Sequence, residues 1–380
     1  MRNRVTLFDN IYIRKLEEKI NLSTIIERCK KGEFTLIAEI GVNYYDIAKK
    51  LRISLMDAAK YMVFSAKNAG IHAVKFQTYK AETLASKKSP SYWDTSEEPI
   101  TSQYVLFKKF DHFGEADYHE LRTFCAQIGI EFCSTPFDFE SADYLDAMMD
   151  VYKISSSDLT NLPFIAYMAK KGKPILLSTG ASNLDEIHEA VDCIRQYNDR
   201  ELVLLHCVLE YPTPYDHANL GKIKALKREF PNVYIGYSDH TKPDACYDVI
   251  KTAYLFGAVV IEKHFTLDKT LKGNDHYHAM DPHDAEEILQ GIQHIECLKG
   301  TAELHSIPTE QAARENARRS IVAAVDIPAG VILSENMLTF KRPGMGISPR
   351  DLLQVVGKAA QINIKKDSIL NWDMLTSSST

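Results

Sequence analysis

Two histidines stand at the ends of short apolar segments, where a strand end would present them to a ligand. His240 follows the segment 233–237, and His264 follows the segment 258–263. Imidazole is the commonest metal ligand near neutral pH, so imidazoles at neighbouring strand ends could converge on one divalent ion. Two protein ligands would leave positions open for water and substrate, as in a Lewis-acid site that holds Mn²⁺ or Mg²⁺. Two core histidines satisfied by hydrogen bonds are the alternative that these residues alone leave open.

Hydrogen-bond donors follow other apolar segments of the same kind. Lys75 and Lys153 provide two ammonium groups, and Ser156, Ser178 and Ser238 provide hydroxyls. Such a set fits the phosphate and the carboxylate of one small molecule. Each residue taken singly has a plainer interpretation, because a lone lysine is usually exposed and a serine hydroxyl often caps the backbone.

The elements that must position these side chains form a regular series. Apolar runs bounded by turn residues predict eight strands, at 35–40, 72–77, 130–134, 150–154, 174–178, 202–207, 233–237 and 258–263. Helical spacing of apolar residues lies between most of them, at 55–68, 116–127, 183–195, 220–228 and 245–255. This α/β alternation predicts a (β/α)8 TIM barrel, closed by a helix at 282–299. A doubly wound open sheet is the alternative, but no GxGxxG follows the first strand at 41–45.

A TIM barrel carries its active site at the carboxyl ends of its strands, and polar residues gather at those positions here. Six or seven of the predicted strands end in polar or ionisable residues, which favours one shared site over unrelated surface residues. The residues are Glu39, Asn43, Lys75, Gln77, Lys153, Ser156, Asp158, Ser178, Thr179, His206, Tyr211, Ser238, Asp239, His240, Glu262 and His264.

The predicted secondary-structure pattern changes after about residue 310, where short β-like segments alternate with turns. We expect a second, small and mostly β domain there. The predicted organisation is therefore an N-terminal extension at 1–34, a barrel at 35–300, a linker at 301–314 and the small domain at 315–376.

Composition excludes several classes of protein. Hydrophobic residues make up 45% and charged residues 25% of the chain, as in ordinary globular proteins. The longest apolar runs are far shorter than the ~20 residues that span a bilayer, and the first thirty residues lack the apolar core of a signal peptide. We therefore expect a cytoplasmic protein with no membrane partner. A net charge of -6 argues against nucleic acid as a partner. Seven scattered cysteines without a CxxC pair favour neither disulfides nor a zinc–thiolate site.

Motifs at these strand ends, taken together, resemble the sialic acid synthase family, whose members use phosphoenolpyruvate to make nine-carbon 2-keto sugar acids. The resemblance runs from residue 35 almost to the end of the chain, and the tail at 328–344 is similar to the family's antifreeze-like (SAF) domain. The matching segments are IAEIG at 37–41, VKFQT at 74–78, STPF at 134–137, YKI at 152–154, ILLSTG at 175–180, HC at 206–207, YPTP at 211–214, SDHT at 238–241, EKHFT at 262–266 and KRPG at 341–344.

The resemblance implies roles for particular residues. His240 and His264 would hold Mn²⁺, with Mg²⁺ or Co²⁺ as alternatives, and the ion would polarise the aldehyde of an open-chain N-acylated mannosamine-type sugar. Glu39 would be an acid/base or hydroxyl anchor, and Arg342 would reach into the active site of a partner subunit in a domain-swapped homodimer. Phosphoenolpyruvate would bind Lys75, Lys153, Ser156, Ser178 and Ser238, whereas Gln77, Asp158, Tyr211 and Asp275 would complete the substrate site.

The implied reaction is a condensation in which C3 of phosphoenolpyruvate attacks the aldehyde, water adds to C2 and phosphate leaves by C–O cleavage. The product would be N-acetylneuraminate or a related nonulosonate. A legionaminic- or pseudaminic-type synthase that uses a 2,4-diacetamido-trideoxyhexose is an alternative. Another phosphoenolpyruvate–aldehyde synthase, of the octulosonate or heptulosonate phosphate class, is a second alternative, and a non-catalytic sugar-binding scaffold is a third.

The sequence departs from the family at the sugar end of the expected site. Tyr44-Tyr45-Asp46 replaces a His-Asn-Gly segment, and Val208-Leu209 replaces a Thr-Asn pair. Asp158 stands where some members have Glu. The segment 273–280 differs from the usual Gly-Pro-Asp form and carries His276 and His278. A second metal site is one interpretation of these two histidines, but we expect them to point at sugar hydroxyls or at solvent.

Overall fold

The computed structural model describes residues 23–273 and 275–376, so most of the expected N-terminal extension at 1–34 lies outside the described residues. The chain divides into two compact units, the first ending at Leu298 and the second beginning at Lys299. Each unit is described by itself.

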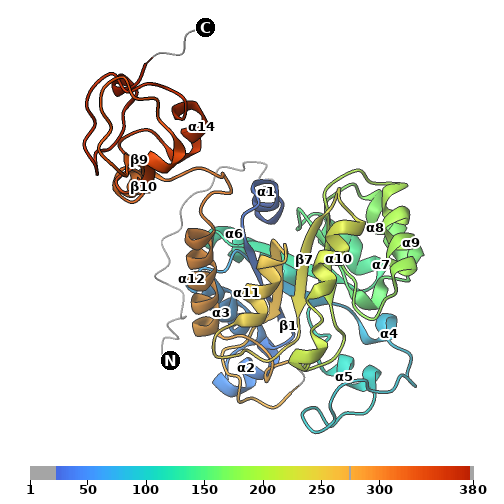
Figure 1. Cartoon of the computed structure of the whole chain (residues 1–380). Helices are drawn as coiled ribbons and strands as arrows, with labels where there is room; N and C mark the ends of the chain where they lie inside the picture. The colour runs from blue at the N-terminus through green and yellow to red at the C-terminus, as the bar shows by residue number, and fades with distance from the viewer. Residues whose placement is uncertain (1–22, 274, 377–380) are drawn as a thin grey trace. The chain divides into compact units, whose positions relative to one another are not determined.

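The first unit contains one parallel sheet of eight strands (Figure 1). The strand order is β3-β2-β1-β8-β7-β6-β5-β4, and the two outermost strands of this order, β3 and β4, lie in contact. The sheet therefore curls into a barrel, and the predicted fold class is confirmed. The strands are β1 Thr35–Gly41, β2 Ala73–Thr78, β3 Glu131–Pro136, β4 Tyr152–Ile154, β5 Ile175–Ser178, β6 Leu202–Cys207, β7 Tyr234–Asp239 and β8 Val260–His264.

Helices surround the strands, as Figure 1 shows for α3, α10, α11 and α12. Gly70, Gly129 and Gly172 follow helices with φ of 82°, 72° and 75°, the left-handed conformation that ends a helix. The helices are α1 Thr24–Lys31, α2 Tyr44–Leu51, α3 Leu55–Asn68, α4 Ala81–Leu84, α5 Gln103–Lys109, α6 Glu115–Ile128, α7 Phe139–Asp146, α8 Leu162–Lys170, α9 Leu184–Arg195, α10 Gly221–Glu229, α11 Asp248–Leu255 and α12 Pro282–Lys299. None of the helices in the described part of the chain is long and apolar enough to cross a bilayer.

Helix α1 packs on the apolar side chains inside the barrel. Its Ile25 and Ile26 are buried in one cluster with Ile37, Val203 and Val260, which come from three different strands. These strand residues lie toward the amino-terminal ends of their strands, so α1 fills that end of the barrel. The carboxyl ends of the strands are left for the polar residues.

The second unit is small and contains an antiparallel pair of strands, β9 Ser320–Ala323 and β10 Leu338–Lys341. Its own core includes Ile321, Leu333 and Leu370, which are almost fully buried. Two short helices, α13 Gln311–Asn316 and α14 Leu352–Val355, accompany the strands. The small, mostly β domain predicted for the end of the chain is confirmed.

Candidate active site

The register of the parallel strands places charged side chains side by side. Glu39 of β1 is paired with Lys75 of β2 on one side and with His264 of β8 on the other. Ser238 of β7 is paired with Glu262 of β8. All five residues are buried, although lysine, glutamate and serine are mostly exposed in proteins. Barrel closure therefore gathers them into one layer at the carboxyl ends of the strands.

Most of the predicted site residues line one cavity at this end of the barrel. Thr135, Phe137, Ser155, Cys207, Leu209 and Glu262 line it as well. Asp158, Asp275 and Arg342 are not among the lining residues. The predicted residues in the lining are Glu39, Lys75, Gln77, Lys153, Ser156, Ser178, Tyr211, Ser238, His240 and His264.

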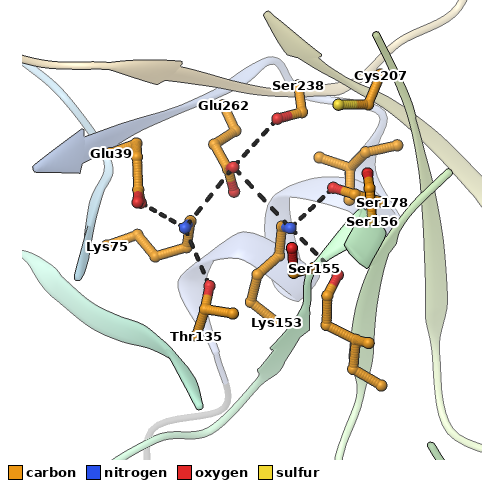
Figure 2. Close-up of polar contacts among 12 residues, drawn as sticks. Glu39, Lys75, Thr135, Lys153, Ser155, Ser156, Ser178, Cys207, Ser238 and Glu262 are labelled. Atoms are coloured by element: carbon orange, nitrogen blue, oxygen red, sulfur yellow. Dashed lines mark hydrogen bonds and ion pairs between the residues drawn. The ribbon is translucent and has the colours of Figure 1, made fainter. Parts of the chain in front are cut away.

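Two buried lysines flank one buried glutamate in the lining of this cavity, as Figure 2 shows for Lys75, Lys153 and Glu262. The Oε1 atom of Glu262 lies 3.7 Å from Nζ of Lys75 and 4.0 Å from Nζ of Lys153. Lys75 also forms an ion pair with Glu39 and donates a hydrogen bond of 3.1 Å to the Thr135 hydroxyl. The four charges balance, which is the condition under which ions persist in a protein interior.

The pKa values of these groups follow from burial and from the balance of charge. Burial raises the pKa of Glu39 and lowers that of Lys153. Burial also opposes the charged forms of Lys75 and Glu262, but their oppositely charged neighbours outweigh it. The pKa of Lys75 is therefore raised by Glu262 and Glu39, and the pKa of Glu262 is lowered by Lys153 and Lys75. Among the four, Lys153 is the cation that an incoming anion would stabilise most.

Serine hydroxyls complete the donor set around these charges. Lys153 donates a hydrogen bond of 2.8 Å to the Ser178 hydroxyl, and Ser238 donates one of 3.2 Å to Glu262. Ser178 and Ser238 thus contact charged side chains in the cavity. The hydroxyl oxygen of Ser156 accepts a hydrogen bond from the Gly180 amide at 2.9 Å. A Cβ on Gly180 would lie 2.9 Å from that oxygen, so glycine is needed there.

His240 is held in an orientation that suits a metal ligand. Its Nδ1 lies 2.7 Å from the carbonyl oxygen of Val208, which can only accept. The neutral imidazole therefore carries its proton on Nδ1 and leaves Nε2 free to bind a metal. The Tyr211 ring packs on it at a centroid distance of 4.2 Å, and the His264 ring lies 5.5 Å away. This backbone hydrogen bond satisfies only one nitrogen of His240, so the residue is not simply a core histidine whose hydrogen bonds are all made within the protein.

A carboxylate and a third imidazole lie beside His264. Asp275 Oδ2 is 3.8 Å from His264 Nδ1, and Asp275 Oδ1 is 3.9 Å from His278 Nε2. Burial raises the pKa of Asp275 to about 6 and lowers the pKa of His264 and His278 well below the usual range. Nδ1 of His264 and both ring nitrogens of His278 have no hydrogen-bond partner among the described residues. These neutral, unpartnered nitrogens fit a metal.

The two loop histidines were expected to point at sugar hydroxyls or at solvent, and the solvent alternative was wrong. His276 and His278 have no exposed surface. His276 Nδ1 lies 2.7 Å from the Thr266 hydroxyl, and its Nε2 lies 3.4 Å from the Asp46 carboxylate. Asp46 belongs to the first segment that departs from the family pattern, so the two departures are in contact. Tyr44, from that same segment, is buried in an aromatic cluster and is not among the cavity-lining residues.

Asp158 does not line the cavity, and Arg342 belongs to the second compact unit. Asp158 ends a short 3-10 turn and accepts a hydrogen bond from the Asn161 side chain at 3.2 Å. Arg342 is exposed in the second compact unit, directly after β10. The geometry of the barrel unit therefore neither includes nor tests Arg342.

Sequence reasoning placed Glu262 at a strand end but gave it no role, set aside a metal role for His278, and did not select Cys207 or Thr135. Glu262 precedes His264 by two positions in the same strand, so both point to the same face, and this spacing was the available signal. Thr135 and Cys207 carry no charge, and the Cys207 thiol is only a weak donor, so neither stands out in the sequence as a site residue. His278 lies on a loop, where no periodicity indicates burial.

Comparisons with known proteins agree with this geometry. Residues 62–303 match the model of the NeuB family, and residues 318–376 match that of the SAF domain. The N,N'-diacetyllegionaminic acid synthase of Legionella pneumophila is 36% identical over 345 residues, covering 89% of this chain and 93% of that protein. The N-acetylneuraminate-9-phosphate synthase of Homo sapiens is 31% identical over 342 residues, covering 90% and 92%.

A solved structure shows the same similarity. The N-acetylneuraminic acid (sialic acid) synthetase of Leptospira borgpetersenii superposes with a TM-score of 0.63 at 29% identity, over 74% of this chain and 90% of that chain. Pseudaminic acid synthase of Helicobacter pylori is 30% identical over 327 residues, covering 84% of this chain and 93% of that protein, so relatives named for different nonulosonic acids share this sequence pattern. The chain is therefore an enzyme of the NeuB family, the nonulosonic acid synthases, with a C-terminal SAF domain.

Proposed function

We propose that this enzyme condenses phosphoenolpyruvate with the aldehyde of an N-acylated mannosamine-type sugar, giving a nine-carbon 2-keto-3-deoxy sugar acid and phosphate. One observation carries the proposal: two buried lysines and two serine hydroxyls converge in a cavity that His240 and His264 also line. The first group suits a small molecule with a phosphate and a carboxylate. The second suits an electrophilic carbonyl.

The lysines would bind phosphoenolpyruvate by replacing part of their present charge balance. Lys75 and Lys153 share the carboxylate of Glu262 at 3.7 and 4.0 Å, and Lys75 also pairs with Glu39, so a bound dianion would compete with these carboxylates for the two ammonium groups. Ser178 lies within hydrogen-bond reach of Lys153 and can turn its hydroxyl toward the anion. Because the site is buried, these contacts are stronger than they would be in water.

Glu39 is the proposed acid/base or hydroxyl anchor. Its carboxylate pairs with Lys75 and accepts a hydrogen bond of 2.9 Å from Gln77 Nε2. Burial raises its pKa, which brings a carboxyl group nearer to the range in which it can both give and take a proton. Glu39 is also in register with His264, so it lies between the lysines and the histidines.

His240 and His264 are the proposed ligands of Mn²⁺, with Mg²⁺ or Co²⁺ as alternatives. A divalent ion bound there supplies a Lewis acid that stabilises negative charge developing on the aldehyde oxygen. The protein contributes the fixed tautomer of His240 and buries both histidines, which are each 6% exposed.

The choice of sugar belongs to the same proposal. The Legionella relative is named for N,N'-diacetyllegionaminic acid and is more similar to this chain than the human relative, at 36% against 31% identity. A 2,4-diacetamido-trideoxyhexose is therefore the alternative to N-acetylmannosamine. The homodimer in which Arg342 reaches a partner's site, and the cytoplasmic location, stay predictions.

A phosphate-release screen tests this function. The enzyme would be incubated with phosphoenolpyruvate, a divalent metal and one of N-acetylmannosamine, its 6-phosphate or a 2,4-diacetamido-trideoxyhexose. We expect one of these sugars to support rapid release of phosphate from phosphoenolpyruvate and the others to support it poorly. Lys153→Met should reduce the rate about 100-fold or more, whereas Lys222→Met, at an exposed position on α10, should leave it unchanged. Phosphate release that needs no sugar aldehyde would contradict the proposal.

A further inference from the structure

His278 is buried in a way that its aromatic neighbours do not explain. Its ring contacts Tyr211 and Tyr277 at centroid distances of 5.7 and 4.9 Å, in edge-to-face arrangements. These contacts pack the ring but satisfy neither nitrogen, and both nitrogens lack a hydrogen-bond partner among the described residues. A fully buried imidazole normally has at least one such partner, so an unpaired one points to a ligand.

The segment that carries His278 is fixed against the end of β8. The backbone of Met280 donates to the carbonyl of His264 at 2.8 Å, and Thr266 donates to the carbonyl of Met280 at 2.9 Å. The Tyr277 hydroxyl donates to the carbonyl of Tyr211 at 2.8 Å. The position of His278 beside His264 is thus set by three hydrogen bonds that do not involve its own side chain.

Three potential ligand atoms converge at this point. One each from His264, Asp275 and His278 lie within 4.8 Å of one another, and all three residues are buried. Two imidazoles and one carboxylate form a known set for divalent transition metals, which leaves further coordination positions open. Exposed acidic clusters are common in proteins that bind no metal there. This cluster differs, because its residues are buried and the imidazole nitrogens in it lack hydrogen-bond partners among the described residues.

The ring of His240 lies where it could join this set. Rings bound to one octahedral ion at metal–nitrogen distances near 2.1 Å have centroids about 4.5 Å apart in adjacent positions and about 6.4 Å apart in opposite ones. The observed distances are 4.8 Å for His264 and His278, 5.5 Å for His240 and His264, and 6.3 Å for His240 and His278. The three observed centroid distances therefore lie within the range expected for imidazoles bound to one octahedral ion.

We propose that His278 is a third imidazole ligand of the divalent metal, and that it acts with Asp275 beside His240 and His264. This inference rests on the proposed function for the presence of an ion at His240 and His264. It has a chemical consequence, because Mg²⁺ prefers oxygen ligands and keeps its waters, whereas imidazole favours the later first-row metals. The chain should therefore bind Co²⁺ much more tightly than Mg²⁺, and His278 should supply much of the difference.

Metal binding measured without phosphoenolpyruvate or sugar tests the inference separately from the reaction. Affinities for Co²⁺ and Mg²⁺ would be determined by competition with a chelator for the full chain and for His278→Asn. We expect the variant to lose about 100-fold in Co²⁺ affinity and less than about threefold in Mg²⁺ affinity. The matched control is His283→Ala, which removes an exposed histidine a few residues further on, in α12, and should change neither affinity. A folded His278→Asn chain that binds Co²⁺ within about twofold of the parent overturns the inference.

A second measurement uses the unaltered chain and does not depend on how the variant folds. Pulsed electron paramagnetic resonance of the Mn²⁺ complex, with ¹⁵N-labelled histidine, counts the imidazole nitrogens bound to the ion. Three bound nitrogens support the inference, and two overturn it. Either result leaves the condensation reaction to be judged by phosphate release, so a failure of the metal assignment can be told from a failure of the proposed function.

Discussion

Replacing Glu262 by glutamine should make the enzyme less stable and its anion site stronger. The substitution preserves shape and lets the side chain keep its contact with Ser238, but it removes the negative charge between two lysines. At an effective dielectric constant of about 20, a charge at 3.7 Å contributes about 4.5 kcal/mol and one at 4.0 Å about 4 kcal/mol. Part of this is offset because the glutamate no longer has to be desolvated, and because Lys153, whose pKa burial already lowers, can lose its proton.

We therefore expect the free energy of unfolding of the barrel to fall by about 3 kcal/mol. Phosphoenolpyruvate should reverse much of this loss, since a bound dianion supplies the charge that Glu262 provided. Its affinity should rise about tenfold, because the repulsion between two anions is gone.

Urea unfolding with and without phosphoenolpyruvate, together with titration calorimetry, measures both effects. Glu229→Gln is the control, because Glu229 forms an exposed pair with His188 whose loss should change stability by less than about 1 kcal/mol. If the Glu262 variant matched this control in stability and in affinity, the idea of a charge-balanced anion site would be refuted.

Three further predictions concern other parts of the molecule. His240→Ala should reduce phosphate release to background in enzyme that has been stripped with a chelator and reloaded with metal, because one metal ligand is gone. Arg342→Ala, or deletion of 312–380, should raise the apparent KM for the sugar about 10- to 100-fold at unchanged KM for phosphoenolpyruvate, as the loss of a charged hydrogen bond implies. Burial and Arg28 lower the pKa of His72 to about 4, so its contribution to stability is present above pH 6.5 and lost as the pH falls toward 4, by up to about 3 kcal/mol. Urea unfolding at several pH values should show this loss in the parent chain and less of it in His72→Asn.

Each of these has its own contradicting result. Full activity of the His240 variant after chelator treatment would remove that residue from the metal site. The same KM in Arg342→Ala and in the exposed control Arg350→Ala would remove Arg342 from the sugar site. The His72 prediction fails if the asparagine variant, whose side-chain oxygen can still accept the Leu36 amide, has the same pH slope as the parent.

Local patterns accounted for most of the architecture. Helix α3 begins and ends where its spacing predicted, because Ser54 caps its first turn and Gly70 stops it. The strands were recognisable because both of their faces are buried, which makes them nearly continuous apolar runs. No bounds were predicted for helix α8, because its sequence LPFIAYMAK is apolar almost throughout and shows little contrast between its faces.

By itself, the sequence determined the barrel, the small second domain, the family, and the strand ends from which the reactive side chains project. These follow from local spacing and from motifs, which a reader of the sequence can see. Only the tertiary structure decided that Glu262 lies between Lys75 and Lys153, and that His278 is buried beside His264. Both depend on how far apart separate elements come when the barrel closes and a loop returns to it. Such distances are set by packing between residues remote in the chain, and no local pattern records them.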